Sequence, residues 1–256
     1  MKEYELSLPN RYSADGVLTV SDTLADRFAE VGYPRERLLP IYYGYDSGLF
    51  PLRPQELALD ASRPLTVVMH GSLDHHHLRR IALDAMTFIV QNRPDTVFKF
   101  VGNQTKTLKS FLHQAARRIP GTLVECTGFV PYSEVARHLA ESTVGIVPYE
   151  ESVGTHCAFV AKIVEYLAVG LPVVSTPLQS AMRYFGDETM VRFAEFDGIS
   201  FGRKVLSWLL DPPEPRQQFA VAASHRVARA LDWGVISRRA VDFVEALTRS
   251  AGPAPS

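Results

Sequence analysis

The chain has 256 residues, 46% of them hydrophobic, so it is long enough to bury a full core in one large or two small domains. Its formal net charge of −1 argues against a nucleic-acid or membrane-surface binder, because such proteins usually carry a large basic excess. Two cysteines, Cys126 and Cys157, are too few for a disulfide framework or a paired-cysteine zinc site. With no signal-peptide pattern after Met1 and no apolar run long enough to span a bilayer, we expect a soluble cytoplasmic protein.

Short runs rich in Val, Ile and Leu alternate with longer amphipathic stretches. The runs predict strands over residues 17–20, 38–43, 65–69, 97–101, 123–127, 144–148 and 172–176. The stretches predict helices over residues 21–31, 78–92, 107–118, 133–141, 162–169, 199–210 and 214–248. From about residue 64 to residue 176 the order is strictly alternating, which is typical of an α/β fold with a doubly wound parallel sheet of the Rossmann type.

The prolines and the ends of the chain indicate its division. Residues 51–63 begin with Pro51 and precede Pro64, so they predict a linker between a short first part, residues 1–50, and a domain over residues 64–248. Residues 249–256 predict a disordered tail. In a doubly wound sheet, ligands collect beyond the carboxyl ends of the strands. The segments expected to carry chemistry are therefore residues 70–77, 102–105, 128–132 and 149–159.

The sharpest local signal lies in residues 162–176, which read KIVEYLAVGLPVVST. Lys162 and Glu165 are three residues apart, so a helix places them on one face, and a plain ion pair would explain that spacing. However, this short helix follows a long loop, ends in Gly-x-Pro and leads into a buried strand. That setting places a cation at the height of a bound diphosphate and a carboxylate where it can accept hydrogen bonds from two vicinal ribose hydroxyls.

This stretch resembles the nucleotide-sugar glycosyltransferases of the GT-B fold, specifically the large retaining family 4 (glycosyl transferases group 1). Further pieces of that family's pattern follow in order: residues 14–25, the turn Tyr43-Gly44-Tyr45-Asp46 through Phe50, residues 127–134, and residues 144–149. The resemblance covers about residues 14–180. It implies a C-terminal donor-binding domain, preceded by a remnant of the N-terminal acceptor domain and the interdomain turn.

The resemblance also implies roles for single residues. Lys162 and Glu165 are the expected catalytic residues: the lysine stabilises the leaving diphosphate and the glutamate fixes the nucleoside. The backbone at Phe129 and Val130 is expected to read the base. The complete expected donor site comprises Gly71, Ser72, Phe129, Val130, Tyr149, Gly154, Thr155, Lys162 and Glu165. The expected donor is a UDP- or GDP-sugar, and the fold implies no metal and no other cofactor.

Two usual charged contacts are missing. Many family members carry an earlier glutamate that approaches the donor sugar, but here the matching position is Cys157, so the amides and hydroxyl of Gly154 and Thr155 are the expected substitutes. Ser72 stands where relatives place an arginine on the diphosphate. Either Arg79 or Arg80 is the alternative, unless both are ordinary surface charges.

The run His75-His76-His77 invites a metal hypothesis, which we disfavour because consecutive residues do not readily converge on one ion. We instead expect the run to lead into a helix near Leu78, capped by Asp74, whose N-terminus would favour a phosphate. The acids Glu150 and Glu151 fit either a solvated loop or a contact with a sugar hydroxyl.

Two classes of function follow from these features. The first is a glycosyltransferase that needs an acceptor-binding domain or partner chain. The second is a non-catalytic module that binds nucleotide sugars; a nucleotide-sugar epimerase is a third, less favoured reading. No nucleic-acid partner and no integral membrane segment are expected.

Overall fold

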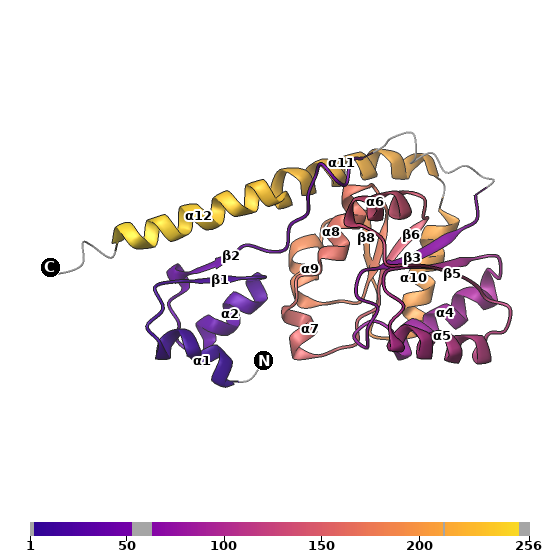
Figure 1. Ribbon diagram of the computed structural model, residues 1–256, viewed down its shortest axis with the longest axis horizontal. Coiled ribbons are helices and arrows are strands. Elements are labelled where there is room, and N and C mark those ends of the chain that lie inside the picture. Colours follow the sequence, from indigo (N-terminus) through magenta and orange to yellow (C-terminus); the bar gives the residue numbers. More distant parts are fainter. Residues whose placement is uncertain (1–2, 53–62, 212, 251–256) are drawn as a thin grey trace.

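The computed structural model describes residues 3–52, 63–211 and 213–250. The predicted linker, residues 51–63, and the predicted tail, residues 249–256, lie largely outside these ranges. Figure 1 shows a small N-terminal part beside a larger α/β part, with a long C-terminal helix running from the second back toward the first. The domain bounds drawn from the sequence therefore stay a prediction.

The N-terminal part contains α1 (Glu3–Arg11), β1 (Val17–Thr19), α2 (Asp22–Glu30), a 3-10 turn and β2 (Leu38–Pro40). The two strands pair in parallel, and Ala25, Tyr33 and Leu38 form a small core of their own. The Ser21 hydroxyl caps α2 by accepting a hydrogen bond of 3.0 Å from the Leu24 amide. β2 is shorter than predicted. Beyond Pro40 the chain soon reaches Tyr42, whose φ of 60° lies in the left-handed region and is incompatible with a strand.

The larger part is built on six parallel strands in the order β5-β4-β3-β6-β7-β8. Their bounds are β3 (Thr66–His70), β4 (Val97–Val101), β5 (Leu123–Gly128), β6 (Val144–Val147), β7 (Val173–Ser175) and β8 (Val191–Phe193). From β3 the chain first builds outward through β4 and β5, and then returns to place β6 on the other side of β3. The order therefore reverses between β3 and β6, the point at which doubly wound sheets bind ligands.

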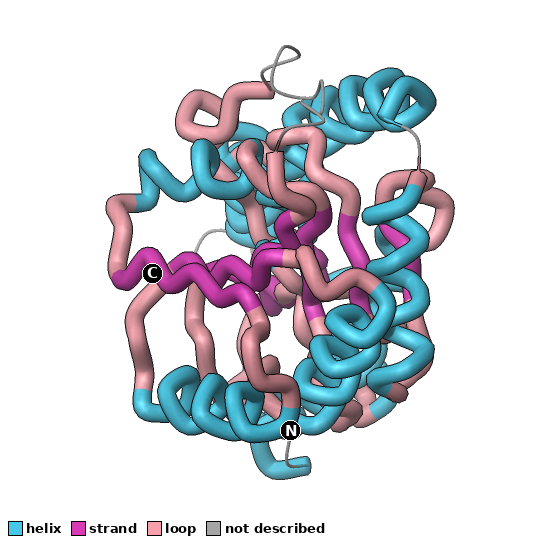
Figure 2. The backbone as a smooth tube through the Cα atoms, turned by 90° about the vertical axis from the view of Figure 1, so that its right-hand side faces the viewer, coloured by secondary structure: helices cyan, strands magenta, loops and turns pink. Residues whose placement is uncertain are grey.

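Helices lie on both sides of these strands (Figure 2). They are α4 (Arg80–Asn92), α5 (Lys106–Arg118), α6 (Tyr132–Ala140), α7 (Val153–Cys157), α8 (Ala161–Ala168), α9 (Gln179–Phe185) and α10 (Gly198–Leu210). The long helices agree with the apolar periodicity of the sequence. The sequence did not predict α7, α9 or β8, because each is too short to show a clear period.

Helix α8 is held tightly against the sheet, and it carries Lys162 and Glu165. Tyr166 is fully buried, and its ring lies against the backbone of Gly145 on β6, where an added Cβ would come within 2.6 Å of the ring. The Tyr166 hydroxyl donates to the Val68 carbonyl of β3 at 3.3 Å. One tyrosine thus fixes α8 across the two strands that flank the switch point.

Residues 214–248 are helical as predicted, but they form two helices rather than one continuous helix. Two helices, α11 (Pro213–Leu231) and α12 (Trp233–Ser250), meet at Asp232. The helix breaks there because the interdomain turn takes its backbone groups: the Tyr45 amide donates to the Leu231 carbonyl, and the Trp233 amide donates to the Tyr45 carbonyl, both at 3.0 Å. Within the described ranges, no helix is both long and apolar enough to cross a membrane.

Candidate functional site

Four of the expected site residues, Gly71, Tyr149, Lys162 and Glu165, gather at the carboxyl ends of β3 and β6. His70 is the last residue of β3, Gly71 follows it, and Tyr149 lies just after β6. Helix α8 brings Lys162 and Glu165 to the same edge, one turn apart. The two charges therefore stand at the switch point of the sheet.

Glu165 forms one end of the site, and it is 8% exposed. Its Oε2 lies 2.5 Å from Nε2 of His70, and its Oε1 accepts a hydrogen bond of 2.8 Å from the Tyr132 hydroxyl. Burial favours the neutral acid, but the hydrogen bonds from His70 and Tyr132 together with the Lys162 charge outweigh it, so the pKa of Glu165 lies below its usual value. The carboxylate is thus charged and held in place, and each oxygen keeps a second lone pair for a ligand.

Lys162 forms the other end. Its Nζ lies 3.1 Å from Nε2 of His77 and 5.8 Å from the centre of the Tyr149 ring. Burial lowers the pKa of Lys162, while the charges of Glu165 and Asp74 oppose that shift. His77 itself is fixed from behind, because its Nδ1 lies 3.0 Å from Oδ1 of Asp74. Asp74, His77 and Lys162 therefore form a line of successive contacts that leads toward the end of β3.

Gly71 leaves the backbone open beside this lysine. Its φ of 91° lies in the region that favours glycine, and an added Cβ would lie 3.4 Å from Cε and 3.7 Å from Nζ of Lys162. Its carbonyl also touches Gly102, where a Cβ would come within 2.4 Å. Two glycines thus let the ends of β3 and β4 approach each other without side chains in between.

The loop after β5 leads from the surface to Glu165. Gly128 has a φ of 74°, Phe129 is 75% exposed, and Val130 packs partly against the main core. Two residues later, Tyr132 begins α6 and contacts Glu165. Its ring also packs on Phe50, with ring centres 5.0 Å apart. The predicted base-reading loop and the predicted ribose carboxylate are therefore joined through one tyrosine.

The segment around Gly154 and Thr155 is a short helix, α7, rather than an open loop. The Ser152 hydroxyl accepts from the Thr155 amide at 3.1 Å, and the Thr155 hydroxyl accepts from the Ser152 amide at 2.9 Å. The same hydroxyl contacts the Glu150 carbonyl at 3.0 Å, and Thr155 is buried. Thr155 therefore closes the capping box of α7, and its amide and hydroxyl are already used there, contrary to the expected substitute for the missing glutamate.

The start of α4 also differs from the prediction. The helix begins at Arg80, and the carboxylate of Glu150 accepts a hydrogen bond of 3.0 Å from the Ile81 amide. Asp74 instead accepts from the His76 amide at 2.9 Å and holds His77. The helix end that was expected to favour a phosphate thus holds a carboxylate supplied by the loop after β6. Glu150 is neither a solvated loop acid nor placed by its contacts on a sugar.

The two arginines considered for the phosphates, Arg79 and Arg80, lie at the surface. Arg79 is exposed, as is Ser72, the residue at the position of the usual arginine. The Arg80 side chain is 79% exposed, and its Nε lies 3.9 Å from the Asp84 carboxylate on the same helix. Arg80 therefore makes a weak surface ion pair, and its contacts do not direct it to Lys162.

Side chains at the start of the histidine run do converge, contrary to the expectation for consecutive residues. One ligand atom from each of Asp74, His75 and His76 lies within 4.8 Å of the others, whereas His77 turns inward to Lys162. The tight turn after β3 explains the difference, since the His76 amide folds back onto Asp74. Both exposed rings also lie close together, with centres 4.0 Å apart.

Cys157, at the position of the missing glutamate, is buried next to the N-terminal part. Its carbonyl accepts a hydrogen bond of 2.6 Å from the Ser21 hydroxyl at the start of α2. Burial raises the pKa of its thiol, with smaller effects from Arg27 and Glu30 of α2. The residue thus helps to join the N-terminal part to α7.

The site contains three residues whose roles were not recognised in the sequence: His70, His77 and Tyr132. His70 ends a strand at the ligand edge, which was the available signal for it. His77 was hidden among three consecutive histidines, and Tyr132 in the loop pattern. Among the described residues, Nδ1 of His70 is buried without a hydrogen-bond partner.

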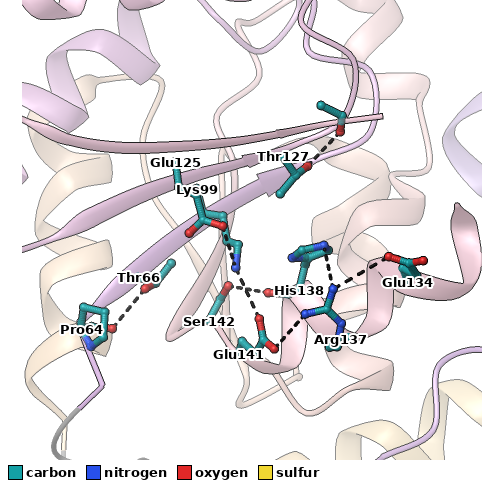
Figure 3. Close-up of polar contacts among 11 residues, drawn as sticks. Pro64, Thr66, Lys99, Glu125, Thr127, Glu134, Arg137, His138, Glu141 and Ser142 are labelled. Atoms are coloured by element: carbon teal, nitrogen blue, oxygen red, sulfur yellow. Dashed lines mark hydrogen bonds and ion pairs between the residues drawn. The ribbon is translucent and has the colours of Figure 1, made fainter. Parts of the chain in front are cut away.

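A second buried lysine provides a useful contrast with Lys162. Lys99 on β4 is 6% exposed, and its Nζ lies 3.3 Å from Glu125 on β5 and 3.5 Å from Glu141 after α6 (Figure 3). His138 lies nearby, and burial, with help from Lys99 and Arg137, lowers the pKa of its ring. Lys99 is thus a cation whose charge is met by two carboxylates of the chain, as expected of a structural lysine.

Residues 64–211, more than half of the chain, match the family described as glycosyl transferases group 1. The chain belongs to this family. The match spans the whole six-stranded sheet and every residue of the candidate site between Gly71 and Glu165.

Two curated relatives share 26% of their aligned residues with the chain. One is the Bacillus subtilis protein TuaH, named as a teichuronic acid biosynthesis glycosyltransferase, which aligns over 95% of this chain and 59% of its own length. The other is the Escherichia coli protein WcaL, named for colanic acid biosynthesis, with 63% and 39% covered. The chain thus spans well under two thirds of the length of either relative.

Solved structures show the same fold. Anabaena HepE in complex with UDP-glucose superposes with a TM-score of 0.74 at 21% identity, covering 96% of this chain and 66% of HepE. A sucrose-phosphate synthase from Thermosynechococcus elongatus gives a TM-score of 0.74 at 16% identity, with 97% and 63% covered. The chain therefore has the fold of the C-terminal half of a GT-B glycosyltransferase, with a remnant of the N-terminal domain.

Proposed function

We propose that this chain is the donor-binding half of a retaining hexosyltransferase that takes its sugar from a nucleoside-diphosphate sugar, with UDP or GDP as the nucleotide. The observation that carries the proposal is the placement of Lys162 and Glu165 one helical turn apart at the switch point of the sheet. The carboxylate is charged and fixed, and the lysine lies beside the open backbone at Gly71. Membership of the family supports the reaction class.

In this proposal each end of the site binds one part of the donor. Glu165 accepts hydrogen bonds from the ribose hydroxyls through the lone pairs that His70 and Tyr132 leave free. Lys162 neutralises the diphosphate as the bond to the sugar breaks, which is electrostatic stabilisation of a leaving group. The backbone at Phe129 and Val130 contacts the base. The Tyr149 ring lies beside Lys162, and no metal is required.

We propose that the acceptor binds to a domain other than the donor-binding half. Retention in this fold lets the donor phosphate help to deprotonate the acceptor, so that the protein supplies position and charge rather than a general base. We therefore propose that transfer needs an N-terminal acceptor domain, on the same polypeptide or on a partner chain. TuaH and WcaL are named for teichuronic acid and colanic acid biosynthesis, which supports a saccharide acceptor.

Calorimetry with UDP, GDP and ADP tests the donor site directly. We expect heat with UDP or GDP, because the site offers partners for both the ribose and the diphosphate. If a folded chain gives no heat with any of the three, the proposed donor site is wrong. ADP offers the same ribose and diphosphate with a third base, so comparing the three heats shows whether the site discriminates among bases.

Turnover then separates an enzyme from a binding module. The chain is incubated with UDP- or GDP-sugars, alone and together with the product of a neighbouring gene that encodes an N-terminal Rossmann domain. We expect transfer only in the second case, with the anomeric configuration of the donor kept in the product by NMR. Binding without transfer under both conditions would favour the non-catalytic module.

A further inference from the structure

The line Asp74–His77–Lys162 joins three groups whose hydrogen-bonding roles are set by chemistry. A carboxylate only accepts, so Nδ1 of His77 must carry the hydrogen toward Oδ1 of Asp74 at 3.0 Å. An ammonium only donates, so Nε2 of His77 must be the acceptor from Lys162 at 3.1 Å. The ring in this arrangement is a neutral imidazole with its free lone pair spent on the lysine. Its side chain is 2% exposed.

The groups around His77 come from three elements. Asp74 and His76 lie on its own segment, Lys162 lies on α8, and the Tyr149 ring from the loop after β6 packs edge-on with ring centres 4.3 Å apart. Burial and the Lys162 charge lower the pKa of His77 to about 3, against the opposing pull of Asp74. The ring is therefore neutral because of the lysine and the dry surroundings, while the carboxylate behind it is already placed to stabilise an imidazolium.

A bound diphosphate would change the balance at this ring. Negative charge beside Lys162 draws the ammonium hydrogens toward phosphate oxygens, which frees the lone pair on Nε2 of His77. The same negative charge favours a second cation nearby. Neither of the expected neighbours supplies one, because Ser72 is uncharged and Arg80 contacts Asp84.

We propose that His77 takes up a proton on Nε2 when a nucleotide sugar binds, and that the Asp74–His77 pair then serves as the second phosphate-binding cation of the site. The proton comes from solvent, no covalent bond changes, and the product is an imidazolium between Asp74 and the diphosphate. This inference rests on the proposed donor binding. In this inference His77 binds the diphosphate and positions Lys162, which a purely structural histidine would not do.

The proton can be counted. Titration calorimetry with UDP-glucose and with GDP-mannose, near neutral pH, is run in buffers of low and high ionisation enthalpy, because the slope of heat against that enthalpy gives the protons exchanged. The diphosphate of a nucleotide sugar does not titrate near neutral pH, so any uptake belongs to the protein. We expect uptake of a substantial fraction of one proton per nucleotide sugar bound.

Variants assign the proton to the ring. His77→Asn should abolish the uptake and weaken binding about tenfold, through the loss of one charge-assisted hydrogen bond. Asp74→Asn should reduce the uptake, because the imidazolium loses its carboxylate. His113→Asn, which replaces an exposed histidine on α5, is the control and should change neither quantity.

A measurement on the unaltered chain guards against misfolding of the variants. Nitrogen NMR of the histidine rings should show Nε2 of His77 as an unprotonated acceptor in the free chain and as protonated after UDP-glucose is added. If the nucleotide sugars bind but no proton is taken up, or if His77→Asn keeps the uptake, the inference is overturned while donor binding stands. If a folded chain binds neither nucleotide sugar, the proposed function fails as well.

Discussion

Glu165 and Lys162 lie one turn apart on α8, but the protein surrounds their two charges with different partners. At Glu165 the chain supplies a hydrogen-bond donor to each oxygen, His70 at 2.5 Å and Tyr132 at 2.8 Å. At Lys162 the ammonium contacts a neutral imidazole and an aromatic ring, and no carboxylate of the described residues forms an ion pair with it. The carboxylate end is therefore preorganised by the protein, whereas the cation end keeps a charge for which an external anion is the natural partner.

Glu165→Ala should give the largest change. If the carboxylate holds the ribose through charged hydrogen bonds, affinity for UDP or GDP should fall by about 1.5–3 kcal/mol. Calorimetry measures the change, and circular dichroism checks the fold, because the substitution also leaves His70 and Tyr132 without a partner. Glu188→Ala removes another buried glutamate, one bound to Arg226 and the Met190 amide, and should leave affinity unchanged. Unchanged affinity in Glu165→Ala would make that glutamate structural.

Lys162→Met should separate binding from stability. Donor affinity should fall by about 1–2 kcal/mol because the diphosphate loses its cation. The free energy of unfolding should stay the same or rise, by up to about 1 kcal/mol, because a partly buried ammonium without a carboxylate is replaced by an apolar chain of similar size. Chemical denaturation and calorimetry give the two numbers.

Lys99→Met is the matched control for that prediction. It replaces a buried lysine whose charge is met by Glu125 and Glu141, so it should not raise stability and should leave nucleotide affinity unchanged. If both lysines behave alike, the proposed difference between a structural and a ligand-binding cation is wrong.

The pH dependence of stability should report on His77. Its pKa is lowered from 6.5 to about 3, so between these values the unfolded chain binds a proton that the folded chain does not. The free energy of unfolding should therefore fall as the pH is lowered from 6.5 toward 3, by at most about 1.4 kcal/mol per pH unit from this group. Urea unfolding at several pH values should show a shallower slope for His77→Asn. A slope equal to that of the unaltered chain would contradict the buried neutral ring, and His113→Asn on α5 is the control.

Chelation should have the smallest effect. Because the site's charge is supplied by Lys162 and its neighbours, EDTA should leave nucleotide-sugar affinity unchanged. The measurement matters because Asp74, His75 and His76 place ligand atoms within 4.8 Å of one another. A loss of affinity that is restored by a divalent cation, and that is absent in a His75→Asn variant, would move the electrostatic role from the lysine to a metal.

The fold and the pair Lys162 and Glu165 could be predicted because their signals are local. Apolar runs of strand length alternate with helical periods, and the two charges are three positions apart on one helix. The partners of those charges could not be predicted in the same way. His77 contacts Lys162 across 85 residues, and His70 contacts Glu165 across 95, so only the packed sheet brings them together.

Local patterns also misled at two places. The helical period continues through Asp232, yet the helix breaks there because Tyr45 from the distant interdomain turn pairs with its backbone. Thr155 looked like a free hydroxyl in a loop, yet it closes a capping box with Ser152. In both cases backbone groups found partners that the nearby sequence does not reveal.

The pairing of the interdomain turn with the break between α11 and α12 has a mechanical consequence. The backbone of Tyr45 is hydrogen-bonded on both sides of Asp232, and the Asp232 carboxylate binds the hydroxyl and amide of Ser47. The N-terminal part is thus joined to the larger part by two chain segments that are hydrogen-bonded to each other. A rotation of one part against the other has to bend both segments together. The junction is therefore stiffer than a single chain segment would be.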